Sequence, residues 1–113
     1  MKLTDLKTAD EVLAAALEAD PELREEWDRL EVARTIASLV IAYRADHELT
    51  QTHLARLLAM HQSAVARLES GEHEPTLPTL LRLARVLDTQ FRIEITPRRI
   101  AVSAQPGLVG SVA

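Results

Sequence analysis

The sequence has 113 residues, of which 47% are hydrophobic, and it carries a formal net charge of −4 at pH 7 with no cysteine. This length fits one domain with extensions, and the lack of cysteine excludes disulfides and thiolate metal sites. With one Trp, one Tyr and one Phe, the hydrophobic content is mostly aliphatic, which favours helices over sheets. No apolar run reaches membrane-spanning length and no signal-peptide core follows Met1–Lys2, so we expect a soluble, cytoplasmic protein without a membrane partner.

The charge is distributed unevenly along the chain. Residues 1–31 hold ten acidic and four basic side chains, whereas residues 32–113 hold seven acidic and nine basic ones, so their formal charges are −6 and +2. An acidic first third before a mildly basic remainder suggests two partners of opposite charge. On charge alone, an acidic helix that only keeps the protein soluble explains the pattern equally well.

The first predicted helix covers residues 9–19. Thr8 is a suitable N-cap, and Asp10 and Glu11 fall in the first turn, where the helix dipole favours acidic groups. The helix is short enough to be marginal alone, and it carries one apolar stripe: Val12, Leu13, Ala16 and Leu17. A partner that covers the stripe can order this segment, or the stripe packs on the domain of its own chain.

The next helix is expected to start at Asp20–Pro21, an acceptor at the N-cap followed by proline at the first helical position. The helical segment should run to about residue 44 or 45 with no internal Gly or Pro, as either one long helix or two helices with a bend near Glu31. The segment begins with an apolar stripe of Leu23, Trp27 and Leu30, and Trp27 either packs in the domain or meets a partner. Further residues continue at core spacing: Val32, Ile36, Leu39, Val40 and Tyr43.

Residues 50–71, TQTHLARLLAMHQSAVARLESG, read as two short helices separated by a tight corner. Each helix has one inward apolar stripe at helical spacing, made by Leu54, Leu57 and Leu58 on the first and by Val65 and Leu68 on the second. The second helix keeps four residues away from its stripe: Gln62, Ser63, Ala66 and Arg67. Amide, hydroxyl and guanidinium groups are those that read base edges in the major groove of DNA. The pattern is that of a helix-turn-helix.

A last helix is expected over residues 77–87. Thr50 should cap the first helix of the motif, Gly71 should end the second, and Thr76 should cap this last helix, whose first turn tolerates Pro78. Five of its residues are expected to close the core: Leu77, Leu80, Leu81, Ala84 and Leu87.

Residues 91–96 alternate apolar and polar side chains, which predicts a half-buried strand. Because no second strand is predicted in the chain, we expect this one to pair with its copy in a second chain as an antiparallel ribbon. The ribbon would bury Phe91, Ile93 and Ile95. Residues 97–113 are rich in small residues and contain two prolines and two glycines, so we expect a flexible tail.

The motif and its continuation, GEHEPTLPTLLRLARVLD, resemble the Cro/CI-type (XRE) DNA-binding domain over residues 32–88, and with its flanks the chain resembles HigA-type antitoxins of bacterial toxin–antitoxin pairs. The resemblance implies a mainly α, lambda-repressor-like domain whose second motif helix enters the major groove of double-stranded DNA. It implies base contacts from Gln62, Ser63, Ala66 and Arg67, and phosphate contacts from Thr50, Gln51, His61 and His73. Alternatively, Arg67 only pairs with Glu69 or Glu72.

The expected organisation is an acidic helical extension at 1–31, a DNA-binding domain at 32–88, a dimerisation strand at 89–96 and a flexible tail at 97–113. A surplus of +2 is small for DNA binding by one copy, whereas a homodimer doubles the contacts and reads a palindromic operator. By resemblance, the extension would neutralise a small basic RelE/HigB-like mRNA-cleaving toxin, and the dimer would repress its own operon. The residues expected to bind the toxin are Leu13, Leu17, Leu23 and Trp27. The alternatives are a stand-alone phage-type regulator without a toxin and an adaptor that no longer binds DNA.

Two positions depart from the family pattern. Ala59 occupies the corner position where glycine is common, and a left-handed conformation there would cost about 1 kcal/mol. His61 stands where Ser or Thr usually caps the recognition helix, and imidazole is a poorer cap. We expect no enzyme, metal or cofactor, because the sequence has no glycine-rich phosphate loop, no nucleophile elbow and no metal-binding histidine motif.

Overall fold

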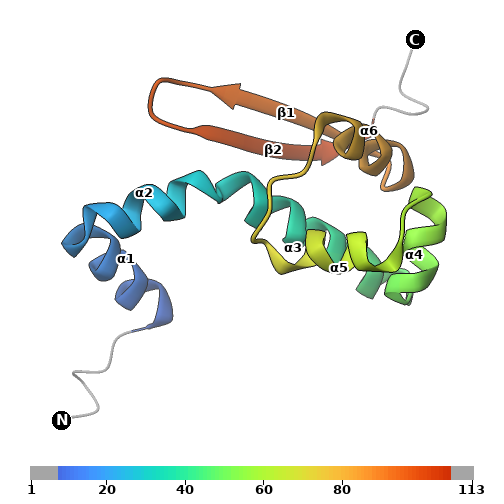
Figure 1. The fold of residues 1–113 in the computed structure, drawn as a ribbon, viewed down its shortest axis with the longest axis horizontal. Coiled ribbons are helices and arrows are strands. Elements are labelled where there is room, and N and C mark those ends of the chain that lie inside the picture. Colours follow the sequence, from blue (N-terminus) through green and yellow to red (C-terminus); the bar gives the residue numbers. More distant parts are fainter. Residues whose placement is uncertain (1–7, 108–113) are drawn as a thin grey trace.

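The computed structural model describes residues 8–107, which form six helices followed by a two-stranded hairpin (Figure 1). The elements are α1 (Ala9–Ala19), α2 (Pro21–Arg29), α3 (Glu31–Asp46), α4 (Gln51–Leu58), α5 (Gln62–Ser70), α6 (Leu77–Val86), β1 (Thr89–Ile95) and β2 (Ile100–Pro106). The predicted mainly helical fold class is confirmed. None of these helices is long and apolar enough to cross a membrane. The outermost parts of the predicted extension and tail, residues 1–7 and 108–113, lie outside the described residues.

Side-chain caps open four of the helices at the predicted positions. Each cap accepts a hydrogen bond from a first-turn N–H group that has no partner inside the helix. The caps are Thr8 to Glu11 N–H at 3.1 Å, Asp20 to Glu22 and Leu23 N–H at 3.1 and 3.2 Å, Thr50 to His53 N–H at 3.0 Å, and Thr76 to Thr79 N–H at 3.3 Å. The helix starts were therefore correctly predicted from local sequence.

The segment after Pro21 forms two helices, which settles the alternative left open by the sequence. The break falls at Leu30, with φ −97° and ψ 12°. On the far side of the break, the Arg34 guanidinium stacks 3.5 Å from the Trp27 ring centroid and donates to the Trp27 carbonyl oxygen at 2.6 Å. Trp27 is thus half-buried against its own chain and joins α2 to α3.

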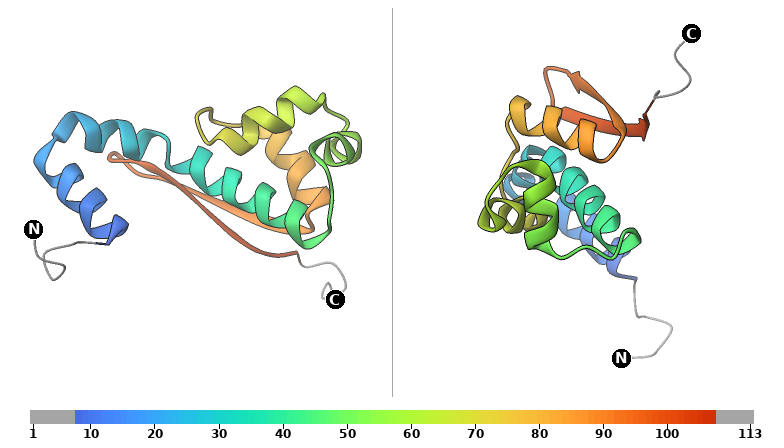
Figure 2. Two further views of the ribbon diagram at one scale, coloured as in Figure 1. Left: turned by 90° about the horizontal axis from the view of Figure 1, so that it is seen from below. Right: turned by 90° about the vertical axis from the view of Figure 1, so that its right-hand side faces the viewer.

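The core lies where α3, α4, α5 and α6 meet, and Figure 2 shows α4 and α5 on one side of α3 with α6 and the hairpin on another. Its most deeply buried large side chains are Ile36, Val40, Leu54, Leu58, Val65 and Leu83. Two predicted core residues are wrong, because α6 buries Leu80 and Leu83, and Leu77 and Leu81 remain 71% and 53% exposed on its other side. On α4, Leu57 also lies outside the core, at 48% exposed.

The prediction that β1 has no partner in its own chain is wrong. β2 pairs with it antiparallel, with Phe91 opposite Ala104, Ile93 opposite Val102 and Ile95 opposite Ile100. The predicted flexible tail therefore contains a strand. It was not predicted, because the small side chains of its sequence, IAVSAQP, give little alternation in hydrophobicity. In the turn, the Thr96 hydroxyl accepts hydrogen bonds from the Arg98 and Arg99 N–H groups at 3.3 and 3.2 Å.

The hairpin packs against the bundle through β2, which contacts α3, and β1, which contacts α6. Phe91 packs against the core, and the Arg99 guanidinium pairs with the Glu31 carboxylate at 3.1 Å. At the opposite end of the chain, α1 contacts mainly α2, and the two helices project from the bundle as an arm (Figure 1). No residue of α1 or α2 is fully buried.

Candidate nucleic-acid interface

The corner between α4 and α5 is built by three backbone features. Ala59 adopts the left-handed conformation, with φ 55° and ψ 45°, and the Met60 N–H group donates to the Ala55 carbonyl oxygen at 2.9 Å. The carbonyl oxygen of Ala59 in turn accepts from the Arg82 guanidinium of α6 at 3.1 Å. Ala55 is 2% exposed, so its small side chain allows close approach where the helices cross. The corner therefore fixes the angle of α5 relative to the bundle.

The outward face of α5 carries the residues predicted to read bases. Val65 and Leu68 are buried, whereas Gln62, Ser63 and Arg67 are exposed. Ala66 is half-buried beside them. The four residues thus lie on the side of α5 away from the core stripe.

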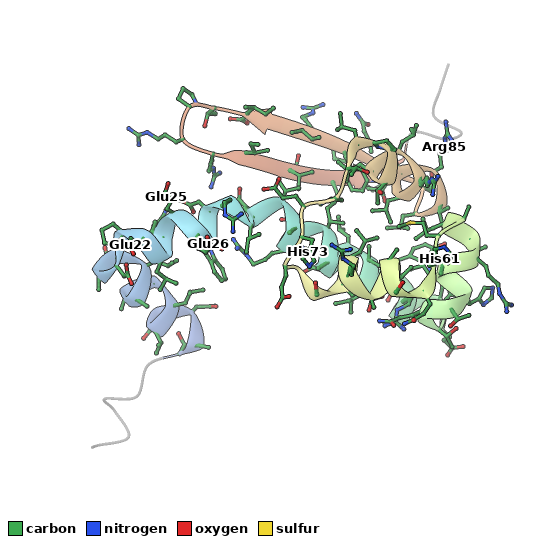
Figure 3. All side chains as sticks on the ribbon, viewed as in Figure 1. Glu22, Glu25, Glu26, His61, His73 and Arg85 are labelled. Carbon is green, nitrogen blue, oxygen red and sulfur yellow. The ribbon has the colours of Figure 1, made fainter. Side chains whose placement is uncertain are left out.

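The residue before α5 does not cap it with its side chain. His61 is extended, with φ −75° and ψ 151°, and makes no side-chain bond to the first turn. Its imidazole is exposed, as is that of His73 in the loop after α5, so two imidazoles flank the recognition helix (Figure 3). The Ala64 N–H group donates to the His61 carbonyl oxygen at 3.0 Å, whereas the N–H groups of Gln62 and Ser63 have no partner among the described residues and remain available to an anion.

A polar network connects α3 to the start of α5. The Arg44 guanidinium donates to both Glu69 oxygens at 2.7 and 2.8 Å, and also to the Leu49 carbonyl oxygen at 3.1 Å. The Gln51 amide donates to the Glu69 carboxylate at 3.2 Å, and the Gln62 amide donates to the Gln51 side-chain oxygen at 2.7 Å. The network therefore runs from the core helix to the first base-reading candidate.

Glu69 is the centre of this network and is held as a carboxylate. Hydrogen bonds from Arg44 are the main cause that lowers the pKa of Glu69, and the same bonds raise the pKa of Arg44. Because Glu69 is engaged by Arg44, it does not pair with Arg67, and Arg67 takes part in no ion pair within residues 8–107. The alternative that Arg67 only pairs with Glu69 or Glu72 finds no support in the structure.

Gln62 keeps the groups that adenine recognition needs. One of its two N–H donors is used by Gln51, which leaves its second N–H donor and its carbonyl oxygen. A donor and an acceptor on one amide match N7 and N6 of adenine. The Gln51 side chain thus holds the Gln62 amide, a contact that sequence reasoning did not predict in addition to the phosphate contact it assigned to Gln51.

Thr50, the phosphate candidate that caps α4, uses only part of its hydrogen-bonding capacity within the chain. The Thr50 hydroxyl oxygen accepts the cap bond from the His53 N–H group at 3.0 Å, and its own hydrogen can still be donated. The pairing of Arg44 with Glu69 was not predicted beforehand, because residues 25 positions apart give no local signal.

Two helices crossing at a fixed corner, with a polar face on the second, define a helix-turn-helix DNA-binding domain. Residues 40–93 match the family model described as Helix-turn-helix. The chain belongs to the XRE-type helix-turn-helix family, whose members are DNA-binding regulators and not enzymes.

Three relatives place the chain more closely within the family. Antitoxin HigA1 of Mycobacterium tuberculosis, in strain CDC 1551 / Oshkosh and in strain ATCC 25618 / H37Rv, is 33% identical over 81 residues, which are 72% of this chain and 54% of the relative. Control protein C.SmaI of Serratia marcescens is 32% identical over 60 residues, 53% of this chain and 71% of the relative. The chain spans about half the length of the HigA1 relatives, and it resembles HigA antitoxins.

Proposed function

We propose that the chain is a dimeric transcriptional repressor that places α5 in the major groove of a palindromic operator. The observation that carries this proposal is the exposed polar face of α5, with Gln62 held in place by Gln51. Gln62 would pair with adenine and Arg67 with guanine, each adding roughly 1–3 kcal/mol of discrimination against the wrong base. Ser63 and Ala66 would complete the face through a hydroxyl and a thymine-methyl contact.

Phosphate contacts would come from the rim of this face. Thr50 and Gln51 start α4, where unpaired N–H groups attract anions, and His61 and His73 flank α5. These groups would orient α5 in the groove without reading sequence. They supply little formal charge, so two copies of the domain are needed for tight binding.

Substitution of the two main readers tests the DNA-binding proposal. We expect Gln62→Ala and Arg67→Ala each to weaken binding to a duplex from the chain's own promoter by about tenfold or more, at one fixed salt concentration. Arg92→Ala is the matched control, because Arg92 is an exposed arginine on the hairpin. Fluorescence anisotropy measures all three. Unchanged binding by both reader variants would favour a protein-binding adaptor instead.

The repressor would also act as an antitoxin through the arm formed by α1 and α2. Between Ala9 and Arg29 the arm carries eight acidic side chains and two arginines, and its apolar residues are only partly covered. A small basic RelE/HigB-like toxin would fit both properties, with Leu13, Leu17, Leu23 and Trp27 as the contact residues. Similarity to Antitoxin HigA1 supports this assignment. Repression of the operon encoding both proteins would follow from DNA binding.

Substitution of an apolar arm residue by glutamate tests toxin neutralisation separately from DNA binding. Leu23 is 40% exposed on α2, and Ile41, at 44%, is a matched control on α3. We expect Leu23→Glu to lose rescue of growth when co-expressed with the basic protein encoded next to it, whereas Ile41→Glu keeps rescue. Operator binding should be unchanged in both. Full rescue by Leu23→Glu would contradict the assignment of Leu23 to the toxin surface.

A stand-alone regulator is the second candidate, because the chain is also similar to Control protein C.SmaI. The two candidates differ in whether a basic protein accompanies the chain. Purification from the native operon followed by mass spectrometry decides between them, since the antitoxin must bring down a stoichiometric basic partner. Recovery of the chain alone would favour the stand-alone regulator.

A further inference from the structure

An apolar groove of about 650 Å³ lies between α6 and β1. Leu77 and Leu81 line it from α6, and Phe91 and Ile93 line it from β1. Leu77, Leu81 and Ile93 are 71%, 53% and 40% exposed, so large aliphatic side chains face solvent there. The groove contains none of the base-reading candidates on α5 and none of the residues of the arm.

The exposure follows from the sequence of α6, which is apolar on two sides. Leu80 and Leu83 enter the core at 7% and 0% exposed, whereas Leu77 and Leu81, one turn apart, lie on the outer side. A helix that is apolar on both sides is normally covered on both sides. The outer side of α6 therefore lacks a cover within the described part of the chain.

The rim of the groove carries one charge of each sign. Arg85 and Asp88 both line it, both are exposed, and neither takes part in an ion pair within residues 8–107. A strongly basic or strongly acidic partner would be attracted by one of these charges and repelled by the other. A second identical groove, turned by a two-fold axis, would meet each charge with its opposite.

The size of the surface also suits a second copy. The exposed parts of Leu77, Leu81 and Ile93 amount to on the order of 300 Å², within the range at which an apolar patch is often a binding surface. A stable interface covers roughly 800 Å² per partner, slightly more than half of it apolar. The polar residues at the groove, among them Thr89 and Gln90, can supply much of the remainder.

We propose that the groove between α6 and β1 binds a second copy of this chain in a two-fold dimer. Leu81 of each copy would enter the groove of the other, and Arg85 would face Asp88 across the axis. The proposal rests on the dimeric DNA-binding function above and names its surface, and it keeps Phe91 and Ile93 in the dimer contact although β1 already pairs with β2. The arm lies at the other end of the molecule from α6 (Figure 1), so the dimer leaves it free for the basic partner.

Sedimentation equilibrium of the full chain at micromolar concentration tests the surface. We expect the wild type to be a dimer, and Leu81→Glu to raise the dimer dissociation constant by about a hundredfold, because a carboxylate would be buried at the centre of the contact. Leu57→Glu is the matched control, since Leu57 is 48% exposed on α4 outside the groove, and it should remain a dimer. A monomeric wild type, or a Leu81→Glu variant that dimerises normally, would overturn the proposal.

A charge exchange tests the two-fold arrangement without touching the apolar residues. Arg85→Glu and Asp88→Lys should each weaken the homodimer by about tenfold, because each variant places two charges of the same sign opposite each other across the two-fold axis. An equimolar mixture of the two should regain wild-type dimerisation, because one variant's doubly acidic rim then meets the other's doubly basic rim. A mixture that remains as weak as the separate variants would overturn the arrangement.

Operator binding in the same samples separates this proposal from the proposed function. A Leu81→Glu variant that dimerises and binds operator normally overturns the surface and leaves DNA recognition standing. A wild type that dimerises through the groove without binding its operator supports the surface and contradicts the proposed function. Loss of the basic partner from Leu81→Glu with an unchanged dimer would assign the groove to that partner and overturn the proposal.

Discussion

Replacement of Ala59 by glycine should stabilise the protein. Ala59 sits at the corner between α4 and α5 in the left-handed conformation, with φ 55° and ψ 45°, which costs an L-residue about 1–2 kcal/mol. Glycine adopts this conformation without the steric cost, but it gives the unfolded chain extra freedom worth roughly 0.4–1 kcal/mol. Ala59 is exposed, so little burial is lost. The net gain is about 0.5–1 kcal/mol in the free energy of unfolding.

Thermal unfolding followed by far-ultraviolet circular dichroism measures this gain. For a chain of this length we expect Tm to rise by about 2–4 °C. Ala42→Gly is the matched control, because Ala42 is exposed within α3, where glycine should lower the free energy of unfolding by about 1 kcal/mol. Operator affinity should not change in Ala59→Gly, since the Arg82 contact uses the backbone carbonyl oxygen, which glycine retains.

The outcome that refutes this reasoning is specific. If Ala59→Gly leaves Tm unchanged or lowers it while Ala42→Gly behaves as expected, the corner is not strained. The methyl group of Ala59 would then contribute to packing that its exposure does not reveal.

Three further substitutions have outcomes set by the structure. His61→Ser should supply the missing side-chain cap of α5 and raise the free energy of unfolding by about 0.5–1 kcal/mol in urea titrations; a decrease would show that His61 stabilises the helix in another way. Leu54→Ala should lower it by about 2–5 kcal/mol, because Leu54 is fully buried, whereas Leu57→Ala should have a much smaller effect; similar losses at both would contradict the assigned core. Glu69→Gln tests the polar network through pH. The pKa of Glu69 is lowered below 4.5 on folding, so its contribution is present above that pH and is lost as the pH falls through the lower folded value. The wild type should therefore lose more stability than Glu69→Gln when the pH falls below 4.5. Parallel dependences of the free energy of unfolding on pH in the two proteins would contradict this role of Glu69.

Features that depend on a few neighbouring residues were predictable from the sequence. The caps at Thr8, Asp20, Thr50 and Thr76 and the end of α5 at Gly71 each need a single side chain or a single positive φ, which the local pattern reveals. The sequence also marked Ala59 as a position where a left-handed conformation would be costly, and the structure has that conformation there. Local chemistry thus located the motif that presents the candidate site.

Features that depend on tertiary pairing were not predictable. α6 has two apolar stripes, and the sequence alone does not say whether Leu80 or Leu81 faces the core. β2 consists mainly of small residues, so only its pairing with β1 identifies it as a strand. The bond between Gln51 and Gln62 depends on Arg44 and Glu69, which meet only once α3 and α5 have packed.

The pairing of β1 with β2 separates folding from association. A strand that is satisfied within its own chain lets the monomer complete its fold before it meets another molecule. On dilution, such a protein yields folded single chains and not unfolded ones. If two copies must join to occupy the operator, occupancy below the dimer dissociation constant rises with the square of the protein concentration. Under the proposed dimeric function, the promoter would then respond more steeply than linearly to the concentration of the protein.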